Sequence, residues 1–416
     1  MKRYEKYKPT GIQWLPEIPE YWEAVKIKYC FNQRSEKGFP NEPILCATQS
    51  RGVIPQTLYE NRVVVVNKGF EGLKLVKVGD FVISLRSFQG GIEYAYYQGI
   101  ISSAYTILSP QKESSSPYFK YLFKSHPFIQ LLQTCVTGIR EGQNINYSVL
   151  GNSFIPIPPI PEQNKIVAYL DKRITLIDNC KCQRERELQT LNELKQAEIA
   201  SVVTRGLNPD VPMKDSGIPW IGQIPDHWEL RRFKTVCSLI REPSKNGDKK
   251  IALENIETNT GRLIATDSVF DGEGVHFEPG DILFGKLRPY LAKVYLAKES
   301  AQAVGDFYVF RSNGSIIPAY LHKLIISAPF IGVVNAGTYG TKMPRASWQD
   351  ISQLNIPLPP IVEQNAIVEY IESKTNKIDT MIEALKAEID RLTEYKQRLI
   401  SDVVTGQIDV RGEQIQ

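Results

Sequence analysis

The chain repeats its own pattern once, and this repeat limits its possible folds more than any other feature. The segment 11–23, which reads GIQWLPEIPEYWE, returns at 217–229 as GIPWIGQIPDHWE, shifted by 206 positions. The segment 155–167, IPIPPIPEQNKIV, returns at 356–368 as IPLPPIVEQNAIV, shifted by 201 positions. Each copy is about 200 residues long, so we predict two related domain-sized units rather than a solenoid of short repeats.

The bulk composition is that of an ordinary soluble protein. The chain has 416 residues, of which 42% are hydrophobic and 23% charged, and this leaves room for two to four domains. No stretch is apolar enough to span a bilayer, and the first residues lack the apolar core of a signal peptide. The six cysteines show no CxxC pair, and we interpret Cys180 and Cys182 as two helix thiols rather than a metal site. We therefore expect a cytoplasmic location, and the net charge of +4 permits nucleic-acid binding without requiring it.

Both copies show the same internal order of a Trp/Pro-rich leading segment, a β-rich region, a proline-rich hinge and a long helix. Runs of β-branched and aromatic residues predict strands at 62–66, 81–85, 104–108, 250–253, 281–284, 291–296 and 307–310. Shorter helices are expected at 116–122 and 317–324. Gly79-Asp80 and Gly280-Asp281 each open a strand after a turn, at the same place in both copies. Each globular part is therefore predicted to be an α+β domain.

A coiled coil is predicted directly after each hinge, where prolines exclude helix and strand interiors. In the second copy, heptad position a holds Ile371, Ile378, Leu385, Leu392 and Leu399, and position d holds Ile382, Ile389 and Val403. The first copy is less regular, because its core positions include Lys181, Arg184, Lys195 and Glu198. Two such helices in one chain predict an antiparallel pair with one globular domain at each end. The four polar residues either fix the register of the pair, lie off the contact line or face another protein.

Motifs of common enzymes are missing from the sequence. It contains no P-loop, no GxGxxG after a strand, no HExxH and no methyltransferase tetrapeptide [DNS]PP[YF]. The histidines at 126, 227, 276 and 322 are scattered, and Glu193-Leu-Lys195 resembles a nuclease motif only in the middle of a helix. We therefore predict that the chain is not an enzyme and uses no cofactor or metal.

The doubled order of these motifs resembles the specificity (S) subunit of type I restriction-modification enzymes. The resemblance rests on Gly-Ile-x-Trp…Ile-Pro-x-x-Trp-Glu, the Gly-Asp strand start and Pro-Pro-Ile-x-Glu-Gln-Asn-x-Ile, each present twice. It implies a pair of target recognition domains that each read one half of a bipartite, asymmetric DNA site. It also implies that the helices set the spacing of the halves and bind two methyltransferase (modification) subunits, with restriction subunits joining the full complex. Expected bounds are 1–157 for the first recognition domain, 158–206 for its helical spacer, 207–358 and 359–406 for the second pair, and 407–416 for a tail.

DNA recognition requires cations for phosphates and amide or guanidinium groups for base edges, at matched places in both copies. The candidates in copy one are Gln49, Ser50, Arg51, Arg86, Arg140, Gln143 and Asn144. Those in copy two are Asn255, Lys286, Arg288, Lys342 and Arg345. Any one of these residues could equally be an ordinary solvated surface residue. Their recurrence near the Gly-Asp strands and the Gly-rich turns at 138–142 and 337–342 favours a DNA-binding role for the group.

Aromatic residues need separate interpretation. Trp14, Trp22, Trp220 and Trp228 recur in both copies, whereas the bases read should differ, so we expect a structural role rather than base stacking. Tyr94, Tyr96 and Tyr97 could line either a core or a groove. Two alternatives to a DNA-specificity subunit remain, a coiled-coil adaptor without nucleic acid and the specificity half of a fused restriction-methylation enzyme. The first leaves the paired basic turns unexplained, and the second requires motifs that the sequence does not show.

Overall fold

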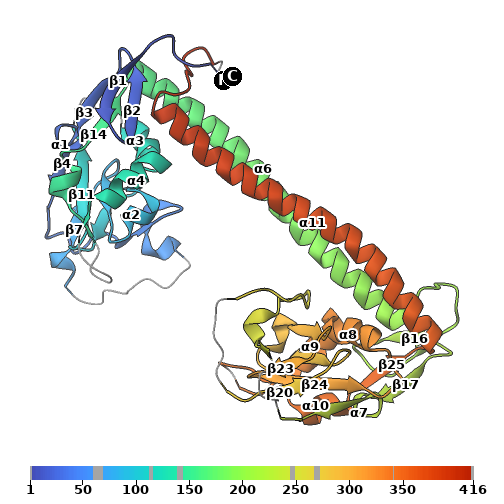
Figure 1. Cartoon of the computed structure of the whole chain (residues 1–416). Coiled ribbons are helices and arrows are strands. Elements are labelled where there is room, and N and C mark those ends of the chain that lie inside the picture. Colours follow the sequence, from blue (N-terminus) through green and yellow to red (C-terminus); the bar gives the residue numbers. More distant parts are fainter. Residues whose placement is uncertain are drawn as a thin grey trace. The chain divides into compact units, whose positions relative to one another are not determined.

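The computed structural model describes residues 2–59, 69–111, 116–137, 144–243, 249–266, 272–340 and 342–413. It divides into two compact units (Figure 1), of which unit 1 comprises Met1–Arg184 and Ala387–Gln416, and unit 2 comprises Glu185–Lys386. The expected strand at 62–66 lies outside the described residues. Each unit contains a globular part and segments of two long helices.

The elements of the first copy follow the expected order. Its strands are β1 Tyr7–Ile12, β2 Leu15–Pro19, β3 Glu23–Lys26, β4 Phe31–Arg34, β5 Leu45–Thr48, β6 Gly52–Pro55, β7 Lys74–Val76, β8 Phe81–Ile83, β9 Glu93–Tyr94, β10 Gly99–Ile101, β11 Thr106–Pro110, β12 Val136–Thr137, β13 Asn144–Ile145 and β14 Phe154–Ile157. Its helices are α1 Ile27–Cys30, α2 Ser87–Gly90, α3 Ser116–Leu122, α4 His126–Thr134, α5 Tyr147–Leu150 and the long α6 Ile160–Arg205, with short 3-10 turns at Gln56–Leu58 and Phe70–Gly72.

The second copy repeats this order with fewer strands among the described residues. Its strands are β15 Met213–Asp215, β16 Gln223–Pro225, β17 Glu229–Arg232, β18 Cys237–Ile240, β19 Lys250–Ile251, β20 Val275–Phe277, β21 Ile282–Gly285, β22 Val294–Leu296, β23 Ala301–Ala303, β24 Phe307–Ser312 and β25 Asn355–Leu358. Its helices are α7 Phe233–Val236, α8 Pro318–Ile326, α9 Ala328–Ala336, α10 Trp348–Gln353 and the long α11 Ile361–Val404, with 3-10 turns η4 Leu253–Asn255 and η5 Pro289–Leu291.

The main sheet has the same topology in both units. Its strand order is β4-β11-β8-β9 in unit 1 and β18-β24-β21-β22 in unit 2, with every pair antiparallel. The buried β8 and β21 both contribute to the hydrophobic cores, as their runs of β-branched and aromatic residues require. The α+β class predicted for each copy is therefore confirmed, and the internal repeat extends to the order of the strands.

The Gly-Asp pair before β8 and β21 forms the same turn in both units. Gly79 and Gly280 have φ of +90° and +92°, a conformation that glycine adopts without steric cost. The buried Asp80 accepts hydrogen bonds from Arg34 on β4, with a shortest distance of 2.8 Å. Its counterpart Asp281 accepts two from Arg311 at 2.7 Å, but this arginine lies on β24, which corresponds to β11 rather than β4. Each unit therefore neutralises the same buried carboxylate from a different strand.

The leading segments contribute to the cores of their units. Trp22 and Trp228 are almost completely buried, and each glycine that follows a long helix packs on one of these rings. Trp14 and Trp220 are partly buried, and each meets a phenylalanine of α4 or α9 edge-on at 5.9 Å between ring centroids. Such edge-to-face pairs stabilise a core, so the structural role expected for the four tryptophans is confirmed.

The glutamine of each hinge joins a long helix to the segment before it. The Gln163 side chain donates to the carbonyl oxygen of Pro158 at 2.8 Å, and that of Gln364 donates to Pro359 at 2.9 Å. Gln364 also accepts from the backbone N–H of Ile317 at 2.7 Å, at the start of α8. Both side chains are fully buried, where a hydrogen-bonded amide holds the chain direction firmly. This geometry accounts for the glutamine that follows Pro-Pro in both copies.

The helices α6 and α11 pack side by side within each unit, as the heptads predict. Three polar core residues of α6, Arg184, Lys195 and Glu198, are partly buried and reach partners on α11, and the exposed Asp178 does so as well. The pairs are Asp178–Lys396 at 2.7 Å and Arg184–Glu388 at 3.0 Å in unit 1, and Lys195–Asp379 at 2.6 Å and Glu198–Tyr370 at 2.7 Å in unit 2. Partner numbers fall on α11 as they rise on α6, so the helices run antiparallel. Three of the four polar residues, Arg184, Lys195 and Glu198, therefore lie at the contact and specify register.

One buried tyrosine fixes each globular part to a helix end. Tyr118 in α3 donates to the carbonyl oxygen of Val404 in α11 at 2.9 Å. Tyr320 in α8 donates to that of Val203 in α6 at 3.0 Å. Burial raises the pKa of both phenols well above the usual value, so they remain protonated donors. Each globular part is thus attached to the last turns of one long helix and is followed directly by the first turns of the other.

Acidification from about pH 6.5 to pH 4 is expected to destabilise unit 2 through His322. This ring is buried, and its Nε2 lies 3.1 Å from the carbonyl oxygen of Val294. Burial lowers its pKa to about 4, whereas an unfolded histidine titrates near about 6.5. As the pH falls, the unfolded chain binds a proton at this ring before the folded chain does. The free energy of unfolding is therefore highest above pH 6.5 and decreases by up to about 3 kcal/mol as the pH falls.

Denaturant unfolding of the wild type and of His322→Gln between pH 7 and pH 4 checks this expectation. The variant should show a smaller loss of unfolding free energy across the window, because glutamine does not titrate there. Identical pH slopes for the two proteins would exclude His322 as the cause.

Among the described residues, no single helix is long and apolar enough to cross a membrane. The α8 and α9 helices meet such a criterion, by length and composition alone, only when the two are counted together across a bend of 63°.

Candidate nucleic-acid interface

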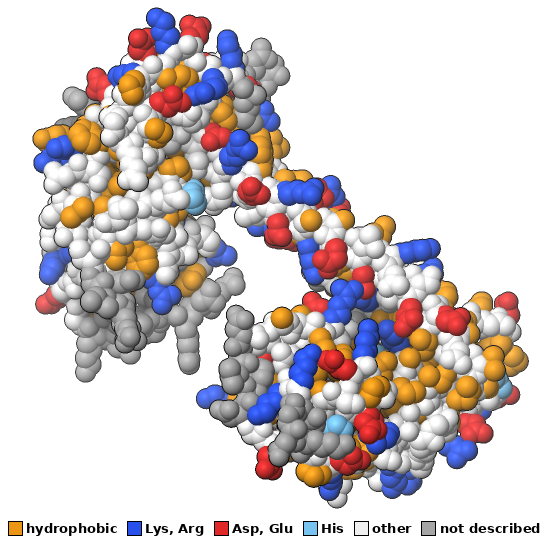
Figure 2. Space-filling model, in the orientation of Figure 1, with side chains coloured by type: hydrophobic (Ala, Val, Ile, Leu, Met, Phe, Trp, Pro, Cys, Tyr) orange, Lys and Arg blue, Asp and Glu red, His pale blue; other side chains and the backbone are white. Residues whose placement is uncertain are grey.

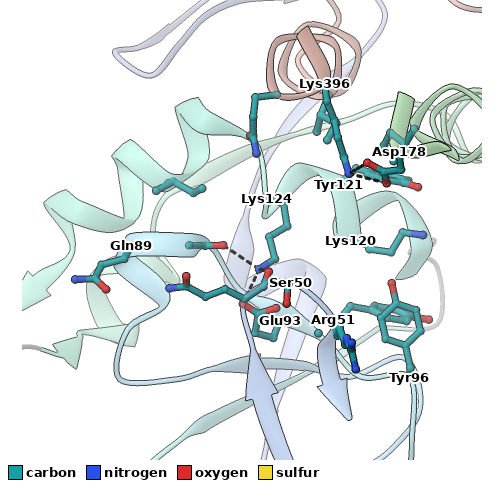
Figure 3. A pocket seen from close by; sticks show the side chains of 18 residues that line it. Ser50, Arg51, Gln89, Glu93, Tyr96, Lys120, Tyr121, Lys124, Asp178 and Lys396 are labelled. Atoms are coloured by element: carbon teal, nitrogen blue, oxygen red, sulfur yellow. Dashed lines mark hydrogen bonds and ion pairs between the residues drawn. The ribbon is translucent and has the colours of Figure 1, made fainter. Parts of the chain in front are cut away.

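The described candidates of copy one gather around the short helix α2. Arg86 immediately precedes this helix, and its side chain is exposed. Gln49 lies in the β5–β6 turn and packs on the end of α2, so closely that a Cβ at Gly90 would stand 2.8 Å from its amide carbon. Ser50 and Arg51 complete the turn and line, with Gln49, a pocket of about 680 Å³ (Figure 3). The candidates of the β5–β6 turn and Arg86 therefore lie at the two ends of α2.

The side chain of Lys124 binds this turn and the end of α2. Its Nζ donates to the carbonyl oxygens of Gln49 at 3.1 Å and Gly90 at 2.9 Å, and it lies 2.5 Å from Oε1 of the buried Glu93. Burial raises the pKa of Glu93 to about 7, although the nearby ammonium acts in the opposite direction. Lys124 is therefore committed to internal contacts and positions the turn rather than offering its charge to a phosphate.

The remaining candidates of copy one lie on or near the β12–β13 hairpin. Asn144 is exposed on β13, which contacts α2, and its side-chain oxygen accepts from the backbone N–H of Ile145 at 2.9 Å. Arg140 and Gln143 belong to the segment between the two strands and lie outside the described residues. The Gly-rich turn at 138–142 that we matched to 337–342 lies there as well.

The candidates of copy two gather where two segments pair beyond the end of β21. Leu287 and Arg345 form an isolated antiparallel bridge, and the Arg288 N–H donates to the carbonyl oxygen of Pro344 at 2.8 Å. The Lys286 carbonyl oxygen accepts from the backbone N–H of Ala346, the residue after Arg345, at 2.8 Å. Lys342 is exposed on this second segment. Four of the five candidates are therefore adjacent, and the Gly-rich turn carries part of the cluster as expected.

The four cations of this cluster differ in how far they are neutralised. Asp306 lies 3.0 Å from Arg345 and 3.7 Å from Lys286. Within the described ranges, no ion pair joins Arg288 or Lys342 to another residue. Arg288 also holds a left-handed backbone conformation, with φ of 51°, which is sterically unfavourable for a residue other than glycine. Strain of this kind concentrates at functional sites, so Arg288 is the strongest single candidate of the group.

Asn255 has a different surrounding from the other candidates. Its side-chain oxygen accepts from the backbone N–H of Ala252 at 2.9 Å, and its amide nitrogen donates to the carbonyl oxygen of Ile264 at 3.4 Å. These contacts close its own turn, and the residue is not part of the paired segments that carry the cations. Its amide is therefore already used within the fold.

Exposed aromatic and apolar side chains accompany both clusters, and the sequence reasoning largely missed them. Tyr290, Tyr339 and Met343 are each about half exposed or more beside the copy-two cations. In copy one Tyr96 is similarly exposed and its ring packs over the turn glycine Gly52, while Tyr94 is partly buried against the core. Apolar groups beside cations suit contact with thymine methyls and sugars. The available signal was the spacing of Tyr290 and Tyr339, each close to a predicted cation.

The face of the molecule drawn in Figure 2 carries charges of both signs. Figure 2 shows Lys and Arg side chains interspersed with Asp and Glu along the helices. Among the described residues, no group of three or more His, Cys, Asp or Glu is placed to hold a metal ion. The arrangement can bind and position a polyanion, and what distinguishes the two units is the shape and composition of their basic clusters.

The comparisons with known proteins follow the same division. The family model described as "Type I restriction modification DNA specificity domain" matches twice, over residues 19–190 and 225–391. The MjaVIII specificity subunit of a type I restriction enzyme from Methanocaldococcus jannaschii is 25% identical, across 95% of each chain. The putative MjaX specificity subunit of the same organism is 23% identical over 98% of this chain and 97% of its own. A chain from a solved structure on complex assembly of a type I R-M system superposes with a TM-score of 0.67, at 17% identity over 94% and 99% of the two chains.

Proposed function

Because the chain belongs to the family of type I restriction modification DNA specificity domains, we propose that it is the DNA sequence-specificity subunit of a type I restriction-modification system. Each recognition domain reads one half of a bipartite, asymmetric site on double-stranded DNA. The helices set the spacing of the halves and dock two methyltransferase subunits, and restriction subunits complete the assembly. The chain itself contributes recognition and positioning, and its partners carry out the chemistry.

The observation that carries this proposal is the contrast between a repeated frame and two unlike basic clusters. The sheet order, hinge glutamines, buried tyrosines and helix contacts recur in both units. The clusters occupy related places but differ in residues, since α2 and the Gln49–Arg51 turn form one and the paired segments around Arg288 form the other. An adaptor that binds no nucleic acid has no use for such a difference, whereas a reader of two unlike half-sites requires it.

The bounds and location complete the proposal. The recognition domains comprise residues 1–157 and 207–358, the helical spacers 158–206 and 359–406, and residues 407–416 form a tail. We place the subunit in the cytoplasm, where its DNA lies. All six cysteines are free thiols, which suits a reducing compartment.

Replacing Arg86 or Arg288 by Ala is expected to weaken DNA binding and to relax specificity in one half-site only. A bidentate arginine–base contact contributes about 1–3 kcal/mol, which corresponds to roughly a 5- to 150-fold loss of affinity. The adenine-methylation map of a genome that expresses the chain with its methyltransferase defines the site and shows which half changes. Fluorescence anisotropy with that duplex at fixed salt then measures affinity.

Arg231→Ala provides the matched control, because this exposed arginine lies on β17, outside both clusters. It should leave the map unchanged. Unaltered affinity and site preference in an Arg86 or Arg288 variant removes that residue from the interface. Relaxation of both half-sites by a single variant contradicts the division of reading between the two domains.

A further inference from the structure

A pocket in unit 1 is lined on one side by the recognition domain and on the other by the helix pair. Figure 3 shows Lys396 and Asp178 on the helices at one side, and Ser50, Arg51 and Glu93 at the opposite side. Lys120, Tyr121 and Lys124, from α3 and the turn after it, complete the wall together with Gln397 of α11. The volume of about 680 Å³ is large enough for a short peptide turn or a small molecule.

The internal repeat identifies the corresponding place in unit 2. Tyr118 and Tyr320 make the same hydrogen bond, so Lys120 and Lys124 correspond to His322 and Ile326. The ion pair of Asp178 with Lys396 corresponds to that of Asp379 with Lys195. Gln397, the residue after Lys396, therefore corresponds to Gln196.

In unit 2 this place is occupied by the chain itself, through the hairpin turn Glu257–Arg262. Arg262 donates to Asp379 at 2.8 Å, and the carbonyl oxygen of Asn259 accepts from the side chain of Gln196 at 3.3 Å. Gly261 packs so closely on α8 that a Cβ there would stand 2.9 Å from the His322 ring and 3.4 Å from Ile326. The turn thus contacts the counterparts of four residues that line the unit 1 pocket.

The hairpin at the same position in unit 1 is shorter. Its last strand pair is Thr48–Gly52, and the turn between them has three residues that border the pocket. In unit 2 the closing bridge Ile256–Leu263 encloses the six residues of the inserted turn. No described residue of unit 1 takes the place of that turn, although Asp178 and Gln397 present the same groups that bind it in unit 2.

We propose that the unit 1 pocket is a docking site for a turn of a partner polypeptide that carries an arginine, in the place that Glu257–Arg262 takes in unit 2. The guanidinium binds Asp178, and a backbone carbonyl three residues earlier accepts from Gln397.

The pocket wall carries charges of both signs, with Arg51 and three lysines beside Glu93 and Asp178. Glu93 and Asp178 place carboxylates in its wall, and like charges repel an anion. Its three lysines already have acidic partners, because Lys124 pairs with Glu93 at 2.5 Å, Lys396 with Asp178 at 2.7 Å and Lys120 with Asp171 at 3.0 Å. Asp178 is therefore the group that the arginine of a docked turn meets, as Asp379 meets Arg262 in unit 2.

The chain's own turn supplies the probe. Within it the Glu257 N–H donates to the Arg262 carbonyl at 2.9 Å, and Thr260 Oγ1 donates to the Glu257 carboxylate at 2.6 Å. A cyclic peptide with the sequence of residues 256–263 is thus expected to keep the turn. Calorimetry with the full chain and no DNA should show one saturable site. Replacing the peptide's arginine by alanine, or Asp178→Asn in the protein, should each weaken binding at least tenfold.

Asp379→Asn is the matched control, since it removes the equivalent helix contact in unit 2, where the place is filled. It should leave peptide affinity unchanged, and circular dichroism verifies that both variants fold. The proposal is overturned by no saturable binding at millimolar peptide or by equal losses in the two aspartate variants. None of these outcomes depends on the DNA site, so a failure here differs from a failure of the specificity function.

Discussion

The first half of the chain alone, residues 1–208, is expected to form a homodimer that specifies an inverted-repeat DNA site in place of the asymmetric one. In unit 1 the recognition fold needs the last turns of α11, where Val404 accepts from Tyr118 and Lys396 pairs with Asp178. The end of α6 offers Val203 and Lys195 in the same roles toward unit 2. A second copy of the half-chain can therefore supply through α6 what α11 supplies in the intact protein.

The dimer is measured by light scattering, and its specificity by the methylation map of cells that also express the modification subunit. In the dimer, Lys195 of one copy faces Asp178 of the other, so Lys195→Glu should weaken dimerisation by setting two carboxylates together. Adding Asp178→Lys to that variant should restore it. A monomeric half-chain that still specifies the full asymmetric site contradicts the roles given to the two halves.

The insertion of one heptad into each long helix is expected to lengthen the unread gap of the DNA site by about three base pairs. Seven residues keep the core positions of both helices in phase and add about 10 Å of rise, whereas duplex DNA rises about 3.4 Å per base pair. The insertions belong directly after Arg184 and directly before Glu388, because these residues pair across the helices. The contacts on either side, Asp178–Lys396 and Lys195–Asp379, are then preserved.

The methylation map again provides the measurement, and the two half-sites should be unchanged while their separation grows. An insertion in α6 alone should abolish methylation, because it displaces its polar core residues from their partners. Methylation that persists with the original gap after the double insertion shows that the helices do not set the spacing.

The two-part organisation and the long helices were predictable, because repeated motifs and heptad periodicity can be recognised in a single sequence. The heptads placed Ile371 and Leu399 at buried positions, and the repeated Pro-Pro-x-x-Glu-Gln marked the start of each long helix. The ion pair of Lys195 with Asp379 was not predictable, because it depends on the register of two segments that lie far apart in the chain. The heptads left the role of the polar residues open, and the antiparallel register decided it.

The candidate interface was predictable in outline and not in detail. Recurrence in two copies selected Lys286, Arg288 and Arg345, and the structure places these three next to one another. It also selected Asn255, whose amide closes a local turn, because a polar residue on a loop looks the same in sequence whether its side chain faces solvent or backbone. The position of the Glu257–Arg262 turn could not be predicted, because a longer hairpin in one copy produces no periodic pattern in the sequence.

The arginine that neutralises the Gly-Asp turn has a consequence for recombination between related subunits. Arg34 lies on the first strand of its sheet and Arg311 on the second, yet both bind the equivalent buried aspartate. A chimera that combines β18 with β11 has no arginine for the buried aspartate. A chimera that combines β4 with β24 has two. An unpaired buried charge costs several kcal/mol, so viable chimeras should exchange recognition domains whole, with their joints at the proline hinges.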